Sequence, residues 1–258
     1  MGLLGAGIGG ILGARGGWLW ALIGAAIGSG IEEHVRASRR TGSSGGDEDA
    51  GSRELFVLGA ISAMLAKMAK ADGRVSENEV RYCEGVFDRL GLRGEKRKYC
   101  IRVFRTAKND AHSIYAYASS FAAEQTDESV REIVYDILWD LACVDGRLGS
   151  AEREILRQIT GPLGVNPRLY AWQCSRRHVS EEGARAPTRD DPYAVLGCAR
   201  TASDEELRNA FRAKAKRLHP DMLRAQGLSE ELVGRATEQM ARLNAAWDEI
   251  KKERGIAS

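Results

Sequence analysis

Histidine and cysteine, which often carry catalysis or bind transition metals, are sparse and scattered in this chain. It contains four histidines and five cysteines among 258 residues. The cysteines form no CxxC pair and no cluster with histidine, so neither a zinc site nor a disulfide framework is indicated, and free thiols in a reducing compartment are expected. No nucleophile–base arrangement, phosphate-binding loop or pair of catalytic carboxylates is recognisable. The sequence therefore predicts a protein that is not itself an enzyme.

Acidic residues recur in two similar turns. Asp72-Gly73-Arg74-Val75 is followed by Glu79, and Asp145-Gly146-Arg147-Leu148 is followed by Glu152 at the same offset. Each glycine suits the left-handed end of a helix. If the two turns meet in space, four carboxylates could bind a hard divalent cation. The alternative is that these residues only cap and space helices.

Capping signals differ between the two turns. Ser76 and Glu79 have the spacing of a capping box, in which a hydroxyl and a carboxylate satisfy the first amide groups of a helix. In the second turn Ser150 can cap, but the residue three positions on is Arg153. In the second turn we therefore expect only half of the capping box, the cap by Ser150.

A His219-Pro220-Asp221 tripeptide ends a basic helical pattern. Ser203 and Glu206 predict the capping box that opens this helix. Proline disfavours a helical residue before it, so the helix should stop at the tripeptide and present the His and Asp side chains from a stiff turn. Four basic residues lie largely off the apolar face of the helix: Arg208, Arg212, Lys216 and Arg217. Such a one-sign patch accelerates encounter with an acidic partner.

The surroundings of the tripeptide resemble the J domain, the defining module of the DnaJ family. The resemblance rests on the DPYAVLG stretch that begins at Asp191, on FRAKAKRLHPD and on LNAAWDEIKK, and we place the domain at residues 190–258. It implies a small helical hairpin that docks on a DnaK-type chaperone and stimulates its ATPase. On that interpretation His219, Pro220 and Asp221 are the trigger, and the four basic residues are the docking face. Many family members have lysine after the tripeptide, where this chain has Met222.

The middle of the chain, residues 53–179, has apolar residues at helical spacing and no alternating strand pattern. Six or seven helices are expected, between polar linkers at residues 35–52 and 180–189. The paired acidic turns resemble the TerB-like helical domain, a family named for tellurite resistance and associated with metal binding. The resemblance implies Asp72, Glu79, Asp145 and Glu152 as candidate ligands; no other cofactor is indicated.

The first 34 residues form a glycine-rich apolar segment. Between Gly2 and Ile31 there is one charged residue, Arg15. A helix of that length would span about 45 Å, more than the roughly 30 Å hydrocarbon core of a bilayer. A signal peptide and a buried soluble helix both fit less well, because the charged n-region is missing and glycine weakens helices in water. We expect a transmembrane helix, with a hairpin that turns at Arg15 as the alternative.

Small residues in this segment recur every fourth position: Gly5, Gly9, Gly13, Gly17, Ala21, Ala25 and Ser29. Such a stripe allows two membrane helices to approach closely, which predicts a homodimer in the bilayer. Arg36, Arg39 and Arg40 follow the segment, so the positive-inside rule places the rest of the chain in the cytoplasm.

Taken together, the sequence predicts an all-α protein with an N-terminal transmembrane helix, a TerB-like helical domain and a C-terminal J-domain hairpin. This combination resembles the DjlA group of bacterial inner-membrane co-chaperones. The formal net charge of +2 gives no indication of a nucleic-acid partner. The alternative is a membrane-tethered TerB-like sensor that recruits the chaperone secondarily.

Overall fold

The computed structural model describes residues 46–73, 77–125, 127–177, 191–225, 228 and 230–256. The predicted transmembrane segment at residues 1–34, its small-residue stripe, Ser76 of the first predicted capping box and the linker at residues 180–189 lie outside these residues. Within the described part every regular element is a helix, so the all-α prediction is confirmed there. None of the described helices is both long and apolar enough to cross a bilayer.

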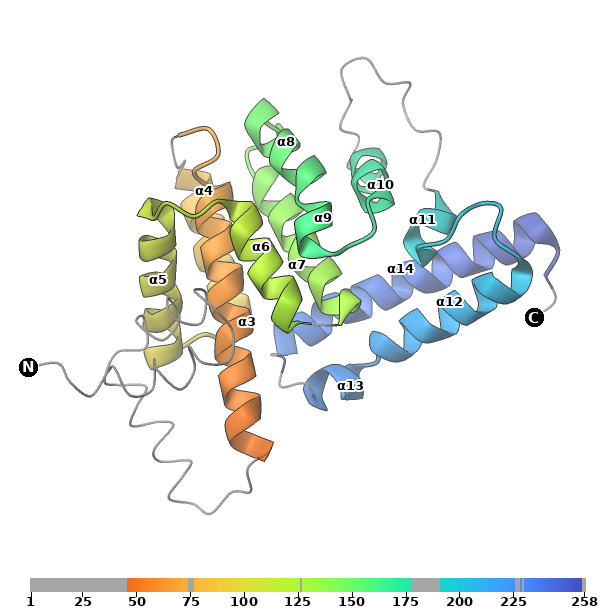
Figure 1. Cartoon of the computed structure of the whole chain (residues 1–258), viewed down its shortest axis with the longest axis horizontal. Helices are drawn as coiled ribbons and strands as arrows, with labels where there is room; N and C mark the ends of the chain where they lie inside the picture. Colours follow the sequence, from red (N-terminus) through yellow and green to blue (C-terminus); the bar gives the residue numbers. More distant parts are fainter. Residues whose placement is uncertain are drawn as a thin grey trace, which may run out of the picture.

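Two groups of helices follow one another along the chain (Figure 1). The first group consists of α3 (Gly46–Met68), α4 (Glu77–Arg89), α5 (Gly94–Asn109), α6 (Ile114–Glu124), α7 (Glu128–Ala142), α8 (Ser150–Gln158), α9 (Thr160–Leu163) and α10 (Arg168–Arg176). The second group consists of α11 (Pro192–Leu196), α12 (Asp204–Arg217), α13 (Pro220–Ala225) and α14 (Glu230–Arg254). The first group thus has eight helices within the described residues, where six or seven were expected. One of the eight is the single-turn helix α9.

Helix α3 begins at Gly46, inside the linker predicted for residues 35–52. The apolar periodicity starts only at Leu55, so the apolar pattern does not predict the first two turns of α3.

The core of the first group forms around α3. Leu58, Ile61 and Leu65 are almost completely buried, and α3 packs against α5, α6 and α7. The hydroxyl of the fully buried Tyr99 in α5 donates a hydrogen bond of 2.9 Å to the carbonyl oxygen of Leu55. This bond fixes α5 against α3 and satisfies a phenol that burial would otherwise leave without water.

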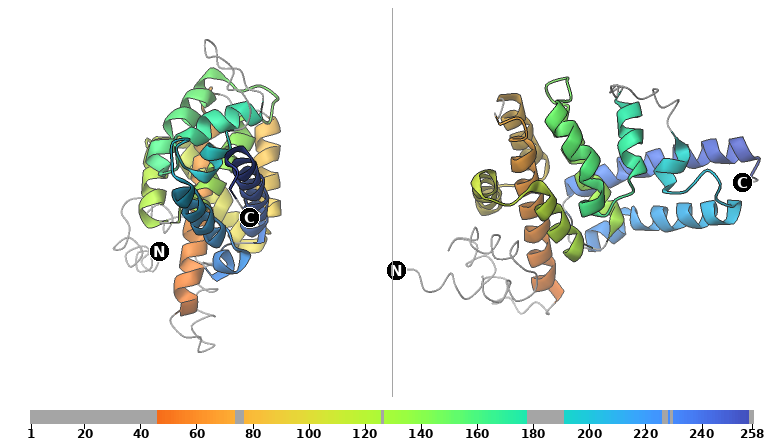
Figure 2. Two further views of the ribbon diagram at one scale, coloured as in Figure 1. Left: turned by 90° about the vertical axis from the view of Figure 1, so that its right-hand side faces the viewer. Right: turned by 45° about the horizontal axis from the view of Figure 1, so that its top comes forward.

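Helix α7 is covered on most of its surface. Twelve of its 15 residues are buried, and most of these are apolar, in line with the helical spacing of apolar residues predicted for residues 53–179. Part of the cover comes from the first group and part from α14, whose N-terminal half lies beside α7 (Figures 1 and 2). The second group therefore packs directly on the first.

The second group is a hairpin of α12 and α14 with α11 packed on α14. Phe211 and Trp247 stack between the hairpin arms, with ring centroids 5.2 Å apart and planes at 17°. Asp191 caps α11 through the amide of Tyr193, Pro192 occupies the first turn, and Gly197 ends the helix at a φ of 80°. The DPYAVLG stretch suits this local structure, because aspartate caps helices, proline fits the first helical turn and glycine adopts the left-handed conformation that ends a helix.

Candidate functional site

The His219-Pro220-Asp221 tripeptide lies at an exposed bend between α12 and α13. The His219 side chain is 57% exposed and that of Asp221 is 80% exposed. The two residues also contact each other, because the amide of Asp221 donates to Nδ1 of His219 at 3.3 Å. The bend thus holds both polar side chains at the surface in a defined relation.

Local sequence signals fix where this bend falls. The capping box at the start of α12 is present: the amide of Ser203 donates to Glu206 Oε2 at 2.7 Å, and the amide of Glu206 donates to Ser203 Oγ at 3.3 Å. At the other end α12 stops at Arg217, and Leu218 is the cap residue before the tripeptide. Both ends of the helix therefore lie where the sequence predicts them.

The tripeptide leads directly into a short helix, where the sequence predicted only a stiff turn. Pro220 begins the short helix α13, where its fixed φ and missing amide hydrogen are tolerated. Met222 follows in α13 and is one of the few exposed large apolar side chains among the described residues, at 44%. Arg224 pairs with Asp221 at 3.5 Å and with Glu230 at 2.9 Å, which ties α13 to the start of α14.

The four predicted docking residues divide into two sets. Arg212 and Lys216 are exposed, Arg208 is half-buried, and these three form no ion pair with another described residue. Arg217 instead lies beside α7, with its guanidinium nitrogen 3.5 Å from Glu128 Oε2. The structure therefore brings three of the four predicted residues together on the outer side of α12.

The paired acidic turns also approach each other. Asn78, at the start of α4, donates a 2.6 Å hydrogen bond to Asp145 Oδ1 in the second turn. Burial raises the pKa of Glu152 to about 7, and the negative charges of Glu79, Asp72 and Asp145 contribute to this rise. The four predicted carboxylates therefore lie within electrostatic reach of one another.

The arrangement of these carboxylates differs from a ligand set. Glu152 Oε2 accepts the amide of Gly149 at 2.8 Å, and this bond caps α8. Gly149, and not Ser150 as expected, is the cap residue of α8. Among the described residues no three His, Cys, Asp or Glu side chains are placed to hold one metal ion. Cation binding at these turns stays a prediction.

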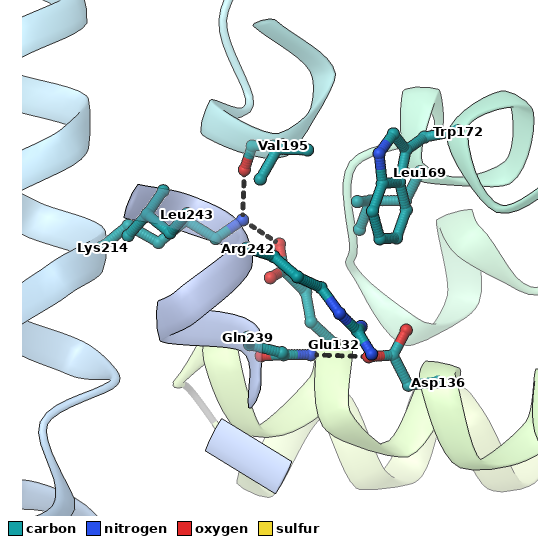
Figure 3. Close-up of a pocket in the computed structure, with 9 residues that line it drawn as sticks. All are labelled: Glu132, Asp136, Leu169, Trp172, Val195, Lys214, Gln239, Arg242 and Leu243. Carbon is teal, nitrogen blue, oxygen red and sulfur yellow. Dashed lines mark hydrogen bonds and ion pairs between the residues drawn. The ribbon is translucent and has the colours of Figure 1, made fainter. Parts of the chain in front are cut away.

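A small cavity lies between the two groups of helices, and Figure 3 shows its lining. Its volume of about 30 Å³ is enough for roughly one water molecule. The lining residues come from α7, α10, α11, α12 and α14: Glu132, Asp136, Leu169, Trp172, Val195, Lys214, Gln239, Arg242 and Leu243. This cavity is a small gap in the packing between the two groups of helices, and it is too small to be a ligand pocket.

Comparisons with known proteins agree with both groups of helices. Residues 59–172 match the family model described as "Tellurite resistance protein TerB", and residues 191–256 match the model described as "DnaJ domain". The protein is thus of the J-domain class, with its J domain packed on a TerB-like helical domain.

Relatives along most of the chain narrow this class. "Co-chaperone protein DjlA" of Photobacterium profundum is 32% identical over 232 residues, which cover 79% of this chain and 79% of the relative. The protein of the same name from Shewanella oneidensis is 30% identical, with 75% and 76% covered. The chain therefore belongs to the DjlA co-chaperone family. No solved structure matches it.

Glu152 should make the stability of the TerB-like domain depend on pH. A carboxyl whose pKa is higher in the folded than in the unfolded chain contributes stability that is present below the unfolded pKa and is lost as the pH rises through the folded pKa. For Glu152 that window runs from 4.5 to about 7. Urea unfolding of wild type should therefore show a lower midpoint near pH 8 than near pH 5, and Glu152→Gln should reduce this difference.

The matched control is Glu154→Gln, on the same helix. Glu154 is exposed, and hydrogen bonds from Arg157 lower its pKa, so its titration falls below this window. An unchanged pH dependence in Glu152→Gln would contradict the assignment.

Proposed function

We propose that this co-chaperone stimulates the ATPase of a DnaK-type chaperone through His219, Pro220 and Asp221. The observation that carries the proposal is the exposure of His219 and Asp221 at a bend between two helices. A trigger has to be reachable, and its side chains have to be held in place before the partner arrives, because ordering them on binding would weaken the complex. The capped helix α12 and the proline at the bend satisfy both conditions.

In this proposal the outer side of α12 forms the docking face. Arg208, Arg212 and Lys216 are four residues apart and therefore project from one side of the helix. The positive patch orients the J domain on an acidic chaperone surface, and its contribution falls with ionic strength. The exposed Met222 adds an apolar contact where a lysine would add a charge.

The protein supplies no catalytic group of its own in this mechanism. Hydrolysis takes place in the chaperone, and the co-chaperone shifts the chaperone toward its hydrolytically competent state, which requires binding that state more tightly than the other. The alternative, a TerB-like cation sensor that recruits the chaperone secondarily, has less support. Its four candidate carboxylates do not converge on one ion within the described residues.

The first 34 residues would anchor the protein in the bacterial inner membrane. Their length and apolar character support a single span, and the arginines that follow support a cytoplasmic location for the helical domains. The stripe of small residues supports a homodimer within the bilayer. Anchoring would confine chaperone stimulation to the membrane surface.

His219→Gln should abolish stimulation while leaving the fold intact, because the side chain is exposed and makes few contacts. In single-turnover ATP hydrolysis by the chaperone, the loss should be at least about tenfold, as for an interface residue worth about 1.4 kcal/mol or more. The exposed Asn244→Gln on α14 is the matched control and should stimulate normally. Wild-type stimulation in the His219→Gln protein would contradict the trigger assignment.

Gly9→Leu and Gly13→Leu should reduce cross-linked dimer in membranes, because a larger side chain on the stripe separates the two helices. Ala14→Leu, off the stripe, is the control and should leave the dimer unchanged. All variants should remain in the membrane fraction after alkaline carbonate extraction. Release of wild type by carbonate would refute the anchor, whereas equal cross-linking of all variants would refute only the stripe.

A further inference from the structure

Four acidic side chains form a ridge along the side of α7 that faces the J domain. Glu128, Glu132, Asp136 and Asp140 recur every fourth residue, so they share one face of the helix. We call these four residues the acidic ridge. The apolar stripe of α7 occupies the remaining sides and packs into the TerB-like core.

Each member of the acidic ridge pairs with a basic residue of the J domain. Arg217 lies 3.5 Å from Glu128, and Lys214 lies 2.8 Å from Glu132. The α14 residues Arg242 and Arg235 lie 3.1 Å from Asp136 and 2.5 Å from Asp140, respectively. The partners come from α12 at the N-terminal end of the ridge and from α14 at its C-terminal end. The four pairs therefore fix both the position and the orientation of the J domain on α7.

The central pair is the most buried of the four. The side chains of Lys214 and Glu132 are 12% and 6% exposed, and the ammonium group also donates to the carbonyl oxygen of Val195 at 2.9 Å (Figure 3). Burial raises the pKa of Glu132, and the positive charge of Lys214 opposes this rise. Separation of the domains would take Lys214 and Glu132 away from each other. The buried pair therefore favours this one docked arrangement of the two domains.

The ends of the ridge are held less uniformly. Asp140 lies between Arg235 and Arg177, each at 2.5 Å. Burial would raise the pKa of Asp140, but the hydrogen bonds and charges of these two arginines outweigh it, and the pKa is lowered. The pair of Arg217 and Glu128 is more open, with side chains 41% and 37% exposed, so salt and water weaken it.

The docked J domain leaves the opposite side of α12 in solvent. At about 100° per residue, Arg212 and Lys216 each lie about 160° around the helix from Lys214. Both are exposed, as are His219 and Asp221. The contact with α7 therefore does not cover the tripeptide or the outer basic residues.

We infer that α12 has two basic faces with separate partners. Lys214 and Arg217 bind the acidic ridge of the TerB-like domain, whereas Arg208, Arg212 and Lys216 face the chaperone, so the J domain acts while it is docked. This inference rests on the proposed function for its chaperone half. The ridge is a binding surface for the protein's own J domain, and Arg217 is a positioning residue that the chaperone does not contact.

Arginine-to-alanine variants of the full chain in vesicles test the division of the faces. In chaperone ATP hydrolysis, Arg212→Ala should raise the co-chaperone concentration that gives half-maximal stimulation by about fivefold, as expected for one charged interface contact. Arg217→Ala should stay within about twofold of wild type, the effect of an exposed ion pair. Equal weakening by the two variants would overturn the division.

Hydrogen exchange tests the docking without a chaperone. Asp140→Asn removes the charge held by Arg235 and Arg177, so exchange in residues 235–243 of α14 should become several times faster, while Arg212→Ala and the exposed control Glu84→Gln should leave it unchanged. Unchanged exchange in Asp140→Asn would refute the ridge as the docking surface.

The same Asp140→Asn protein separates a permissive contact from an inhibitory one. Its half-maximal stimulation should remain within about twofold of wild type, because the exposed face of α12 is unaltered. A several-fold increase in stimulation would show that docking blocks the J domain and would overturn the inference. If wild type gives no stimulation at all, the proposed function fails, while hydrogen exchange still decides whether the ridge holds the J domain.

Discussion

The ion pair between Lys214 and Glu132 is the contact on which the arrangement of the two domains depends. Both charges are almost fully removed from water, and each would be left buried and unpaired if the other were lost, at a cost of about 3–5 kcal/mol. Hydrophobic burial is non-directional and could be satisfied by many relative orientations of two helical units. The hydrogen bond from Lys214 to Val195, within the J domain, holds the ammonium group in place. The buried ion pair can therefore form in only a few relative orientations of the two domains.

This constraint explains why α7 can be buried on nearly every side while it carries four carboxylates in a row. Its apolar residues complete the TerB-like core, and its acidic ridge is covered by the basic residues of α12 and α14. The J domain in turn keeps its own core, through the stacked Phe211 and Trp247, and presents the tripeptide at the end of α12 that is open to solvent. Positioning and presentation therefore use different sides of one helix.

Much of this could be predicted from the sequence, because the signals were local. The capping box at Ser203 and the stop before Pro220 depend on a few neighbouring residues, and the structure has them as predicted. The acidic ridge was missed, although its four-residue spacing was visible, because a row of carboxylates on a helix is more often a solvated face. The pairing of Arg217 with Glu128 was missed for a related reason: only the position of α7 separates the two sides of α12. The start of α3 lies in a polar segment, and α13 has only six residues, so neither shows the apolar periodicity that is the main signal a sequence offers for helices.

The most direct test measures the distance between the two domains while the chaperone is bound. Pulsed electron paramagnetic resonance reports this distance between spin labels at two exposed positions, Glu84 in α4 and Glu249 in α14. The half-buried Cys143 and Cys198 are replaced by serine in the labelled protein. A J domain that acts from the acidic ridge predicts one narrow distance distribution that stays in place when the ATP-bound chaperone is added. A distribution that shifts or broadens on chaperone binding would show that the J domain leaves α7 to act, which would contradict the account.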